Sequence, residues 1–121
     1  MPDTITLYRP VGPEELELIK NLDWKAFPPR LAEQPIFYPV LNENYAAQIA
    51  REWNVPASGS GYVTRFDVDK SYIDRFEAQN VGGPDHNELW IPAEDLPEFN
   101  KHIVGVISVV EEFHSERKKE E

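Results

Sequence analysis

Two charged residues stand at the ends of predicted strands, where side chains can reach a cleft. Glu88 belongs to the stretch His86-Asn87-Glu88-Leu89-Trp90-Ile91-Pro92, which follows a Gly-Gly-Pro loop. Arg9 ends the first predicted strand, residues 4–9. Arginine holds phosphate through paired donors, and a carboxylate accepts hydrogen bonds from ribose hydroxyls. If folding brings the two together, they indicate a nucleotide cleft.

The alternation of a strand assigns the side chains around Glu88 to two faces. His86, Glu88 and Trp90 share one face, and Leu89 and Ile91 point the other way. We expect the two aliphatic residues in the core, so the other three face the surface or a cleft. Glu88 is then either a carboxylate that stabilises an oxocarbenium-like centre or a solvated acid, one of 22 acidic residues in the chain.

Arg9 and several aromatic residues are the other candidates. Arg9 shares a strand face with Leu7, so the charge needs a partner there, either a phosphate or one of the many carboxylates. Tyr38 and Tyr45 are candidates to pack beside a nicotinamide or adenine ring. Tyr45 stands out because it lies off the apolar stripe of its helix, near a helix start that favours anions.

The elements that position these residues are short. The first helix is predicted to begin at Pro13, with proline at its first position, and to bury Leu18, Ile19 and Leu22. Strand 36–40 is expected at a sheet edge because Pro39 cannot donate to a ladder. The remaining predicted elements are a helix over 43–53, a strand over 62–68, a helical turn over 71–76, an extended segment over 76–81, the Glu88 strand, a partly helical segment over 93–102 and a strand over 103–110 or a little longer.

The second helix carries the clearest pattern. Asn42 is its predicted N-cap, and helical spacing turns four residues toward the core, Ala46, Ile49, Ala50 and Trp53. Strands interleaved with short helices predict an α+β fold with mixed or largely antiparallel sheets. Residues 1–113 are expected to form one globular domain, followed by a polar tail over 114–121.

Composition excludes several classes of function. The net charge of −10 repels nucleic acid and suits a basic protein partner. Cysteine is absent, the three histidines lack metal-ligand spacing, and no metal site is predicted. The sequence contains no run of about 18 apolar residues and no signal pattern, so no membrane partner and a cytoplasmic location are expected. No P-loop, G-x-G-x-x-G, G-x-S-x-G or H-E-x-x-H motif is found.

The order of these segments resembles the ADP-ribosyltransferase-like fold. The matching segments are Leu7-Tyr8-Arg9, Tyr62 to Val68, His86 to Pro92 and Ile103 to Val110. The chain also resembles small bacterial proteins that carry an "ADP-ribosylation/crystallin" label. That label refers to ADP-ribosyl hydrolases, which are larger and all-helical and use metal-binding acid clusters. Two features depart from the transferase pattern. Phe37-Tyr38-Pro39 stands where a Ser-Thr-Ser motif is expected, and His86 stands two positions before the glutamate.

The resemblance implies NAD as substrate and Glu88 as the catalytic acid. Arg9 would hold the NAD phosphates or the nicotinamide ribose, and Tyr38 or Tyr45 would lie beside the nicotinamide. His86 and Trp90, on the Glu88 face, would complete the cofactor-binding set. The acceptor of the ADP-ribose stays open. Two alternatives also stay open: a non-catalytic binding or regulatory module on the same scaffold, and a small structural domain that forms a homodimer.

Overall fold

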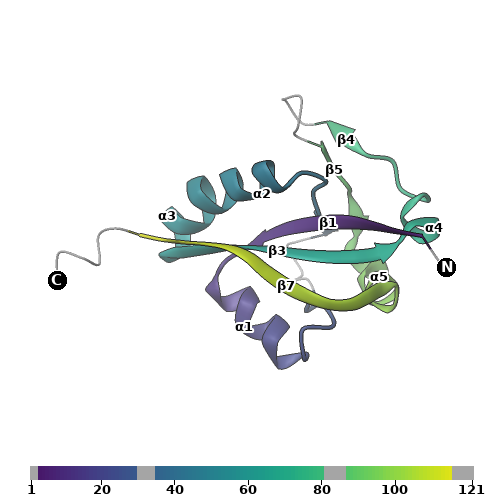
Figure 1. The fold of residues 1–121 in the computed structure, drawn as a ribbon, viewed down its shortest axis with the longest axis horizontal. Helices are drawn as coiled ribbons and strands as arrows, with labels where there is room; N and C mark the ends of the chain where they lie inside the picture. Colours follow the sequence, from purple (N-terminus) through teal and green to yellow (C-terminus); the bar gives the residue numbers. More distant parts are fainter. Residues whose placement is uncertain (1–2, 30–34, 81–86, 116–121) are drawn as a thin grey trace.

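A computed structural model describes residues 3–29, 35–80 and 87–115 (Figure 1). Its strands are β1 (Thr4–Val11), β2 (Ile36–Phe37), β3 (Ser60–Asp69), β4 (Gln79–Asn80), β5 (Asn87–Glu88), β6 (Ile91–Pro92) and β7 (Ile103–His114). Its helices are α1 (Pro13–Asn21), α2 (Glu43–Ile49), the π-helix η1 (Ala50–Asn54), α3 (Val55–Ser58), α4 (Lys70–Ile73), the 3-10 turn η2 (Ala93–Asp95) and α5 (Leu96–Lys101). The fold is α+β, and every strand pairing among these residues is antiparallel.

The central sheet has the order β1-β3-β7 and separates two apolar clusters. In the register of β1 and β3, Leu7 lies opposite Phe66 on one face, where the larger cluster packs against Ile19 of α1. Val63, on the other face of β3, packs with Ala50. Each face of the sheet is therefore covered by its own helical layer, and side chains one residue apart on β1 enter different layers.

Segments 36–41 and 87–92 pair in one continuous antiparallel register. Phe37 lies opposite Ile91, and Val40 lies opposite Glu88. Val40 also bridges to Tyr8, with backbone hydrogen bonds of 2.7 and 2.9 Å. β2 lies in a two-stranded sheet with β6, in agreement with the expected edge position, whereas Val40, at the end of the segment, is bridged on both sides, to Tyr8 and to Glu88. Pro39 is tolerated because only its carbonyl is used, as acceptor from Leu89 N at 2.8 Å.

Helix α1 begins as predicted and ends in an unexpected way. Pro13 occupies its first turn after Gly12, which is extended. Ile19 is fully buried, but Leu18 and Leu22 are exposed, contrary to the predicted stripe. The helix stops at Asn21, and Asp23 and Trp24 both take a φ of 62°. After this left-handed turn, Trp24 rather than Leu22 packs against the core.

The predicted second helix is longer than expected and changes its winding. The Asn42 side chain accepts from Tyr45 N at 3.0 Å and caps α2 as predicted. After Ile49 the helix widens into η1, and it continues as α3 to a left-handed Gly59. Trp53 is 71% exposed, so its predicted core position is wrong. The π-turn inserts an extra residue per turn, and this shift turns Asn54 toward the sheet side and Trp53 away from it.

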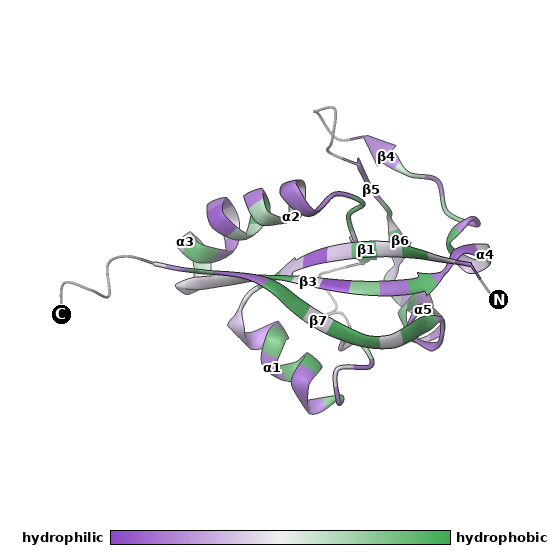
Figure 2. Ribbon diagram, in the orientation of Figure 1, coloured by the Kyte–Doolittle hydropathy of each residue, from purple (hydrophilic) through white to green (hydrophobic). Residues whose placement is uncertain are grey.

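Strand β7 forms one edge of the central sheet and carries many hydrophobic residues (Figure 2). It continues beyond residue 110, as the prediction allowed, because Ser60 pairs with His114 and Ser115 N donates to Gly59 O. His114 therefore belongs to the strand rather than to a tail. Within the described part of the chain, no helix is both long enough and apolar enough to cross a membrane.

Candidate functional site

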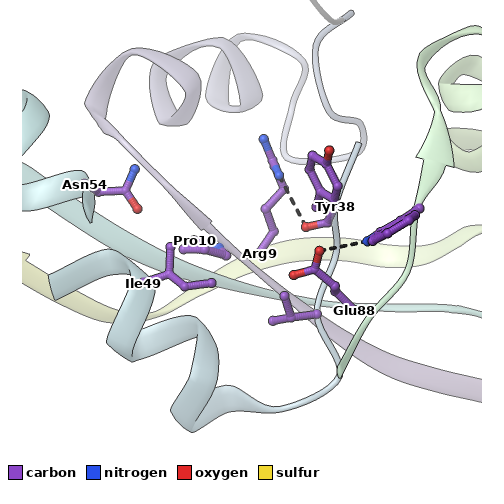
Figure 3. A pocket seen from close by; sticks show the side chains of 8 residues that line it. Arg9, Pro10, Tyr38, Ile49, Asn54 and Glu88 are labelled. Carbon is purple, nitrogen blue, oxygen red and sulfur yellow. Dashed lines mark hydrogen bonds between the residues drawn. The ribbon is translucent and has the colours of Figure 1, made fainter. Parts of the chain in front are cut away.

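A pocket of about 400 Å³ opens where β1, the 36–41 segment, the Glu88 strand and η1 meet (Figure 3). Its volume lies within the range of small-molecule sites. The residues that line it are Arg9, Pro10, Tyr38, Val40, Ile49, Asn54, Glu88 and Trp90. The strand register explains this set, because Tyr38, Val40, Glu88 and Trp90 all lie on one face of the paired segments.

Both carboxylate oxygens of Glu88 accept hydrogen bonds from aromatic side chains. Trp90 Nε1 donates to Oε1 at 2.8 Å, and the Tyr45 hydroxyl donates to Oε2 at 3.2 Å. Tyr45 lies in the first turn of α2, Glu88 lies in β5, and Trp90 lies between β5 and β6. Each carboxylate oxygen keeps a second acceptor position, so an oriented carboxylate remains able to bind hydroxyl groups of a ligand.

The carboxylate in turn affects Tyr45. Burial raises the pKa of the Tyr45 phenol above 10.0, and the charge and hydrogen bond of Glu88 raise it further. The phenol therefore stays protonated at neutral pH and acts toward Glu88 as a donor.

Two aromatic rings flank the pocket beside Glu88. Tyr38 lies opposite Trp90 in the register, and the rings meet edge to face with 6.4 Å between their centroids. The two side chains are 40% and 45% exposed. Half-exposed rings at a pocket are suited to pack against a planar or sugar-like ligand.

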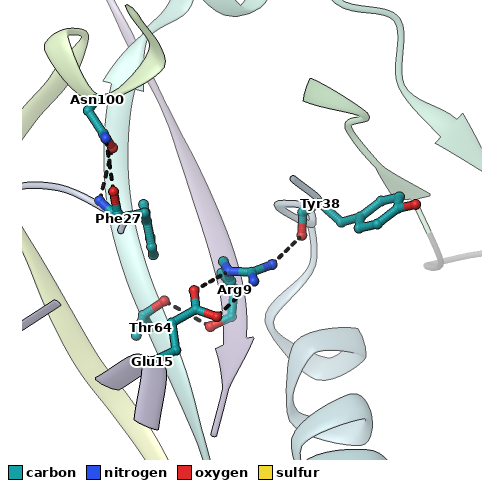
Figure 4. A network of polar contacts seen from close by, with 6 residues as sticks. All are labelled: Arg9, Glu15, Phe27, Tyr38, Thr64 and Asn100. Carbon is teal, nitrogen blue, oxygen red and sulfur yellow. Dashed lines mark hydrogen bonds and ion pairs between the residues drawn. The ribbon is translucent and has the colours of Figure 1, made fainter. Parts of the chain in front are cut away.

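Arg9 reaches the pocket but is occupied by protein partners. Its Nε and Nη2 donate to the two oxygens of Glu15 at 2.7 and 2.9 Å (Figure 4). Nη1 donates to the Tyr38 carbonyl at 3.4 Å, and the guanidinium lies 4.7 Å from the centroid of the Phe37 ring. The sequence left open whether Arg9 pairs with a phosphate or with a carboxylate. In the structure it forms an ion pair with Glu15. In this conformation Arg9 ties α1 to the segment that carries Tyr38.

Asn54 is a lining residue that the sequence did not indicate. Its Oδ1 is buried and finds no hydrogen-bond partner within the described ranges. A buried acceptor without a donor costs roughly 1–3 kcal/mol. Asn54 reaches this place because η1 packs closely on β3 at Gly61, where a Cβ would come within 2.6 Å of Ala50 O. A π-turn has no clear sequence signature, so helical periodicity could not place Asn54 here.

Arg9, Tyr38, Glu88 and Trp90 thus line one pocket, and Tyr45 contacts it through its hydrogen bond to Glu88. His86, the sixth predicted residue, lies outside the described residues. Pro10, Val40 and Ile49 add an apolar lining that was not predicted. Within residues 3–29, 35–80 and 87–115, no group of three His, Cys, Asp or Glu side chains is placed to hold a metal ion.

Comparison with models of known protein families, with curated proteins and with solved structures finds no match for this chain.

Proposed function

We propose that the pocket binds NAD through its nicotinamide ribose and that the protein is an ADP-ribosyltransferase-like enzyme. The observation that carries the proposal is the Glu88 carboxylate, oriented by Tyr45 and Trp90 at a pocket that Arg9 also lines. The resemblance of the segment order to the ADP-ribosyltransferase-like fold supports the same choice of ligand.

In the proposed reaction the bond between C1′ of the ribose and the nicotinamide nitrogen breaks. The electron pair leaves with nicotinamide, which departs as a neutral molecule, and an oxocarbenium-like centre forms at C1′. Glu88 binds the ribose hydroxyls and offsets this positive charge. An acceptor then attacks C1′ and loses its proton. Water as acceptor gives free ADP-ribose, and a protein nucleophile gives a modified protein.

The Glu15 ion pair limits what Arg9 can do in this scheme. A phosphate contact through Nε and Nη2 requires Glu15 to release both donors. With the pair intact, Arg9 positions the Tyr38 segment and therefore the wall of the pocket. The proposed chemistry thus rests on Glu88 rather than on Arg9.

The test is nicotinamide release from NAD by the wild type and by Glu88→Gln. The amide keeps the size of the side chain and removes its charge, so we expect release to fall at least about 100-fold while NAD still binds. Glu17→Gln, at an exposed position of α1, is the matched control and should behave as wild type. Equal release by wild type and Glu88→Gln would show that the catalytic role is wrong.

A non-catalytic binding or regulatory module is the second candidate. Two observations favour it: Arg9 is already paired with Glu15, and the net charge of −10 suits a basic protein partner. Calorimetric titration separates the two candidates. NAD binding without nicotinamide release, by a protein that retains a basic partner in a pull-down, supports the module.

A further inference from the structure

We infer that Asn54 recognises a hydrogen-bond donor of the ligand, and that this donor is the carboxamide amino group of nicotinamide. The inference rests on the NAD-binding function proposed above and extends it to the part of the ligand that contacts η1. It makes Asn54 a specificity-determining residue of the pocket.

The lining of the pocket changes character along its length. Figure 3 shows Asn54 on one side of the pocket and Glu88 on the other, with Pro10 and Ile49 between them. A ligand that fits this order carries hydroxyls at one end, a flat apolar part in the middle and a polar group at the other end. The nicotinamide riboside half of NAD has this order: ribose, pyridine ring, carboxamide.

The unsatisfied atom of Asn54 fixes the kind of polar group. Oδ1 is an acceptor, so its complement is an N–H or O–H donor. Oδ1 is buried in this conformation, and no hydrogen bond to a described residue holds the Asn54 amide in place. In the inferred complex, a rotation about χ2 presents the oxygen to the ligand. The amino group of a primary carboxamide supplies such a donor, whereas an acetyl group of the same shape does not.

The local backbone supports a ligand-binding role. The π-helix η1 ends at Asn54, and π-segments occur frequently at functional sites. The same segment presses against Gly61, where a side chain would clash with Ala50 O and with Asn54 Cβ at 2.8 Å. The fold therefore holds the backbone of Asn54 beside the pocket, while its amide makes no hydrogen bond to the residues that the structure describes.

The experiment compares two dinucleotides by titration calorimetry: NAD and its 3-acetylpyridine analogue. The analogue keeps the charge and the carbonyl group and lacks only the amino donor. We expect the wild type to bind NAD at least about tenfold more tightly than the analogue. Asn54→Leu should bind both ligands with the affinity that the wild type has for the analogue. Asn54→Asp, which keeps an acceptor, should retain the preference for NAD.

Thermal unfolding without ligand separates recognition from a structural role. Replacing an unsatisfied buried acceptor with an apolar side chain should leave the Tm unchanged or raise it. If Leu at this position prevents folding, Asn54→Ala supplies the same comparison of the two ligands.

The outcomes separate this inference from the proposed function. Equal binding of the two dinucleotides by the wild type overturns the role of Asn54 and leaves NAD binding intact. If Asn54→Leu still prefers NAD to the analogue, the role of Asn54 is likewise overturned and NAD binding stays intact. Failure of the wild type to bind either ligand at millimolar concentration overturns the proposed function, and this inference with it.

Discussion

Tyr45 donates a hydrogen bond to Glu88 across 43 residues of sequence, with 3.2 Å between the hydroxyl and Oε2. The contact joins the first turn of α2 to β5, and the chain passes through η1, α3, β3, α4 and β4 between these two elements. The orientation of the carboxylate therefore depends on how the helix docks. Changes at Tyr45 should affect both stability and the proposed chemistry.

Tyr45→Phe removes this donor and keeps the ring. We expect the free energy of unfolding to fall by about 1 kcal/mol and nicotinamide release to fall roughly tenfold, because the carboxylate loses one of its two orienting contacts. Urea denaturation and a release assay measure the two effects. Tyr62→Phe is the control, since no hydrogen bond of the Tyr62 hydroxyl to a described residue is found. Release unchanged in Tyr45→Phe would show that Trp90 alone orients the carboxylate.

Glu15→Gln tests the ion pair with Arg9. Arg9 is only 8% exposed, so loss of the opposite charge leaves a buried cation poorly compensated. We expect the free energy of unfolding to fall by about 2 kcal/mol. The exposed pair Lys70–Asp74 supplies the control, because Asp74→Asn should cost less than about 0.5 kcal/mol. If Glu15→Gln and Asp74→Asn lower the free energy of unfolding by similar amounts, the Arg9–Glu15 pair does not behave as a buried ion pair.

His102 predicts a dependence of stability on pH. A hydrogen bond to Asp69 raises the pKa of the imidazole above 6.5; burial opposes this shift, and Glu98 adds to it. The ring also stacks on Tyr72 with 4.2 Å between centroids. Because the folded protein holds the proton more tightly, this contribution is fully present below pH 6.5 and is lost as the pH rises through the raised pKa.

Urea denaturation between pH 5 and 9 measures the effect of His102. The free energy of unfolding should decrease over the interval that begins near pH 6.5. In His102→Gln, which keeps polar contacts and cannot become charged, that part of the decrease should disappear. The same decrease in both proteins would assign it to other groups.

Gly61→Ala tests the contact between β3 and η1. The added Cβ would lie 2.6 Å from Ala50 O and 2.8 Å from Asn54 Cβ, so η1 must move. We expect a loss of about 2 kcal/mol in the free energy of unfolding and a weaker affinity for NAD. Gly12→Ala is the control, because its Cβ would meet ordinary contacts of 3.6 Å or more. If Gly61→Ala leaves the free energy of unfolding unchanged, the packing of η1 adjusts easily to the added methyl group.

Local rules predicted the elements and most of the candidate site. Alternation alone placed Leu89 and Ile91 in the core and Glu88 and Trp90 on the opposite face, at the surface or in a cleft; the structure confirms the two core positions and shows that the opposite face lines a pocket. The α+β class followed from the order and length of the segments. The role of Arg9 could not be decided, since its partner Glu15 is one of many carboxylates, and only packing selects among them.

The errors at Trp53 and Leu22 arise where the backbone leaves its regular period. The prediction for Trp53 assumed 3.6 residues per turn through a segment that winds as a π-helix, and the same error hid Asn54. The prediction for Leu22 assumed that the helix continued, but the chain turns back through two left-handed residues. Both departures depend on tertiary packing, of Gly61 against Ala50 and of Trp24 against the core.

The pairing of segments 36–41 and 87–92 has a consequence for how this protein can change. Even-numbered positions such as 38, 40, 88 and 90 face the pocket, and odd-numbered positions such as 37, 89 and 91 face the core. Inserting or deleting one residue in either segment would exchange the two groups, sending a carboxylate inward and aliphatic side chains outward. Descendants of this sequence can therefore change the length of the connection between the two segments much more freely than the length of either segment.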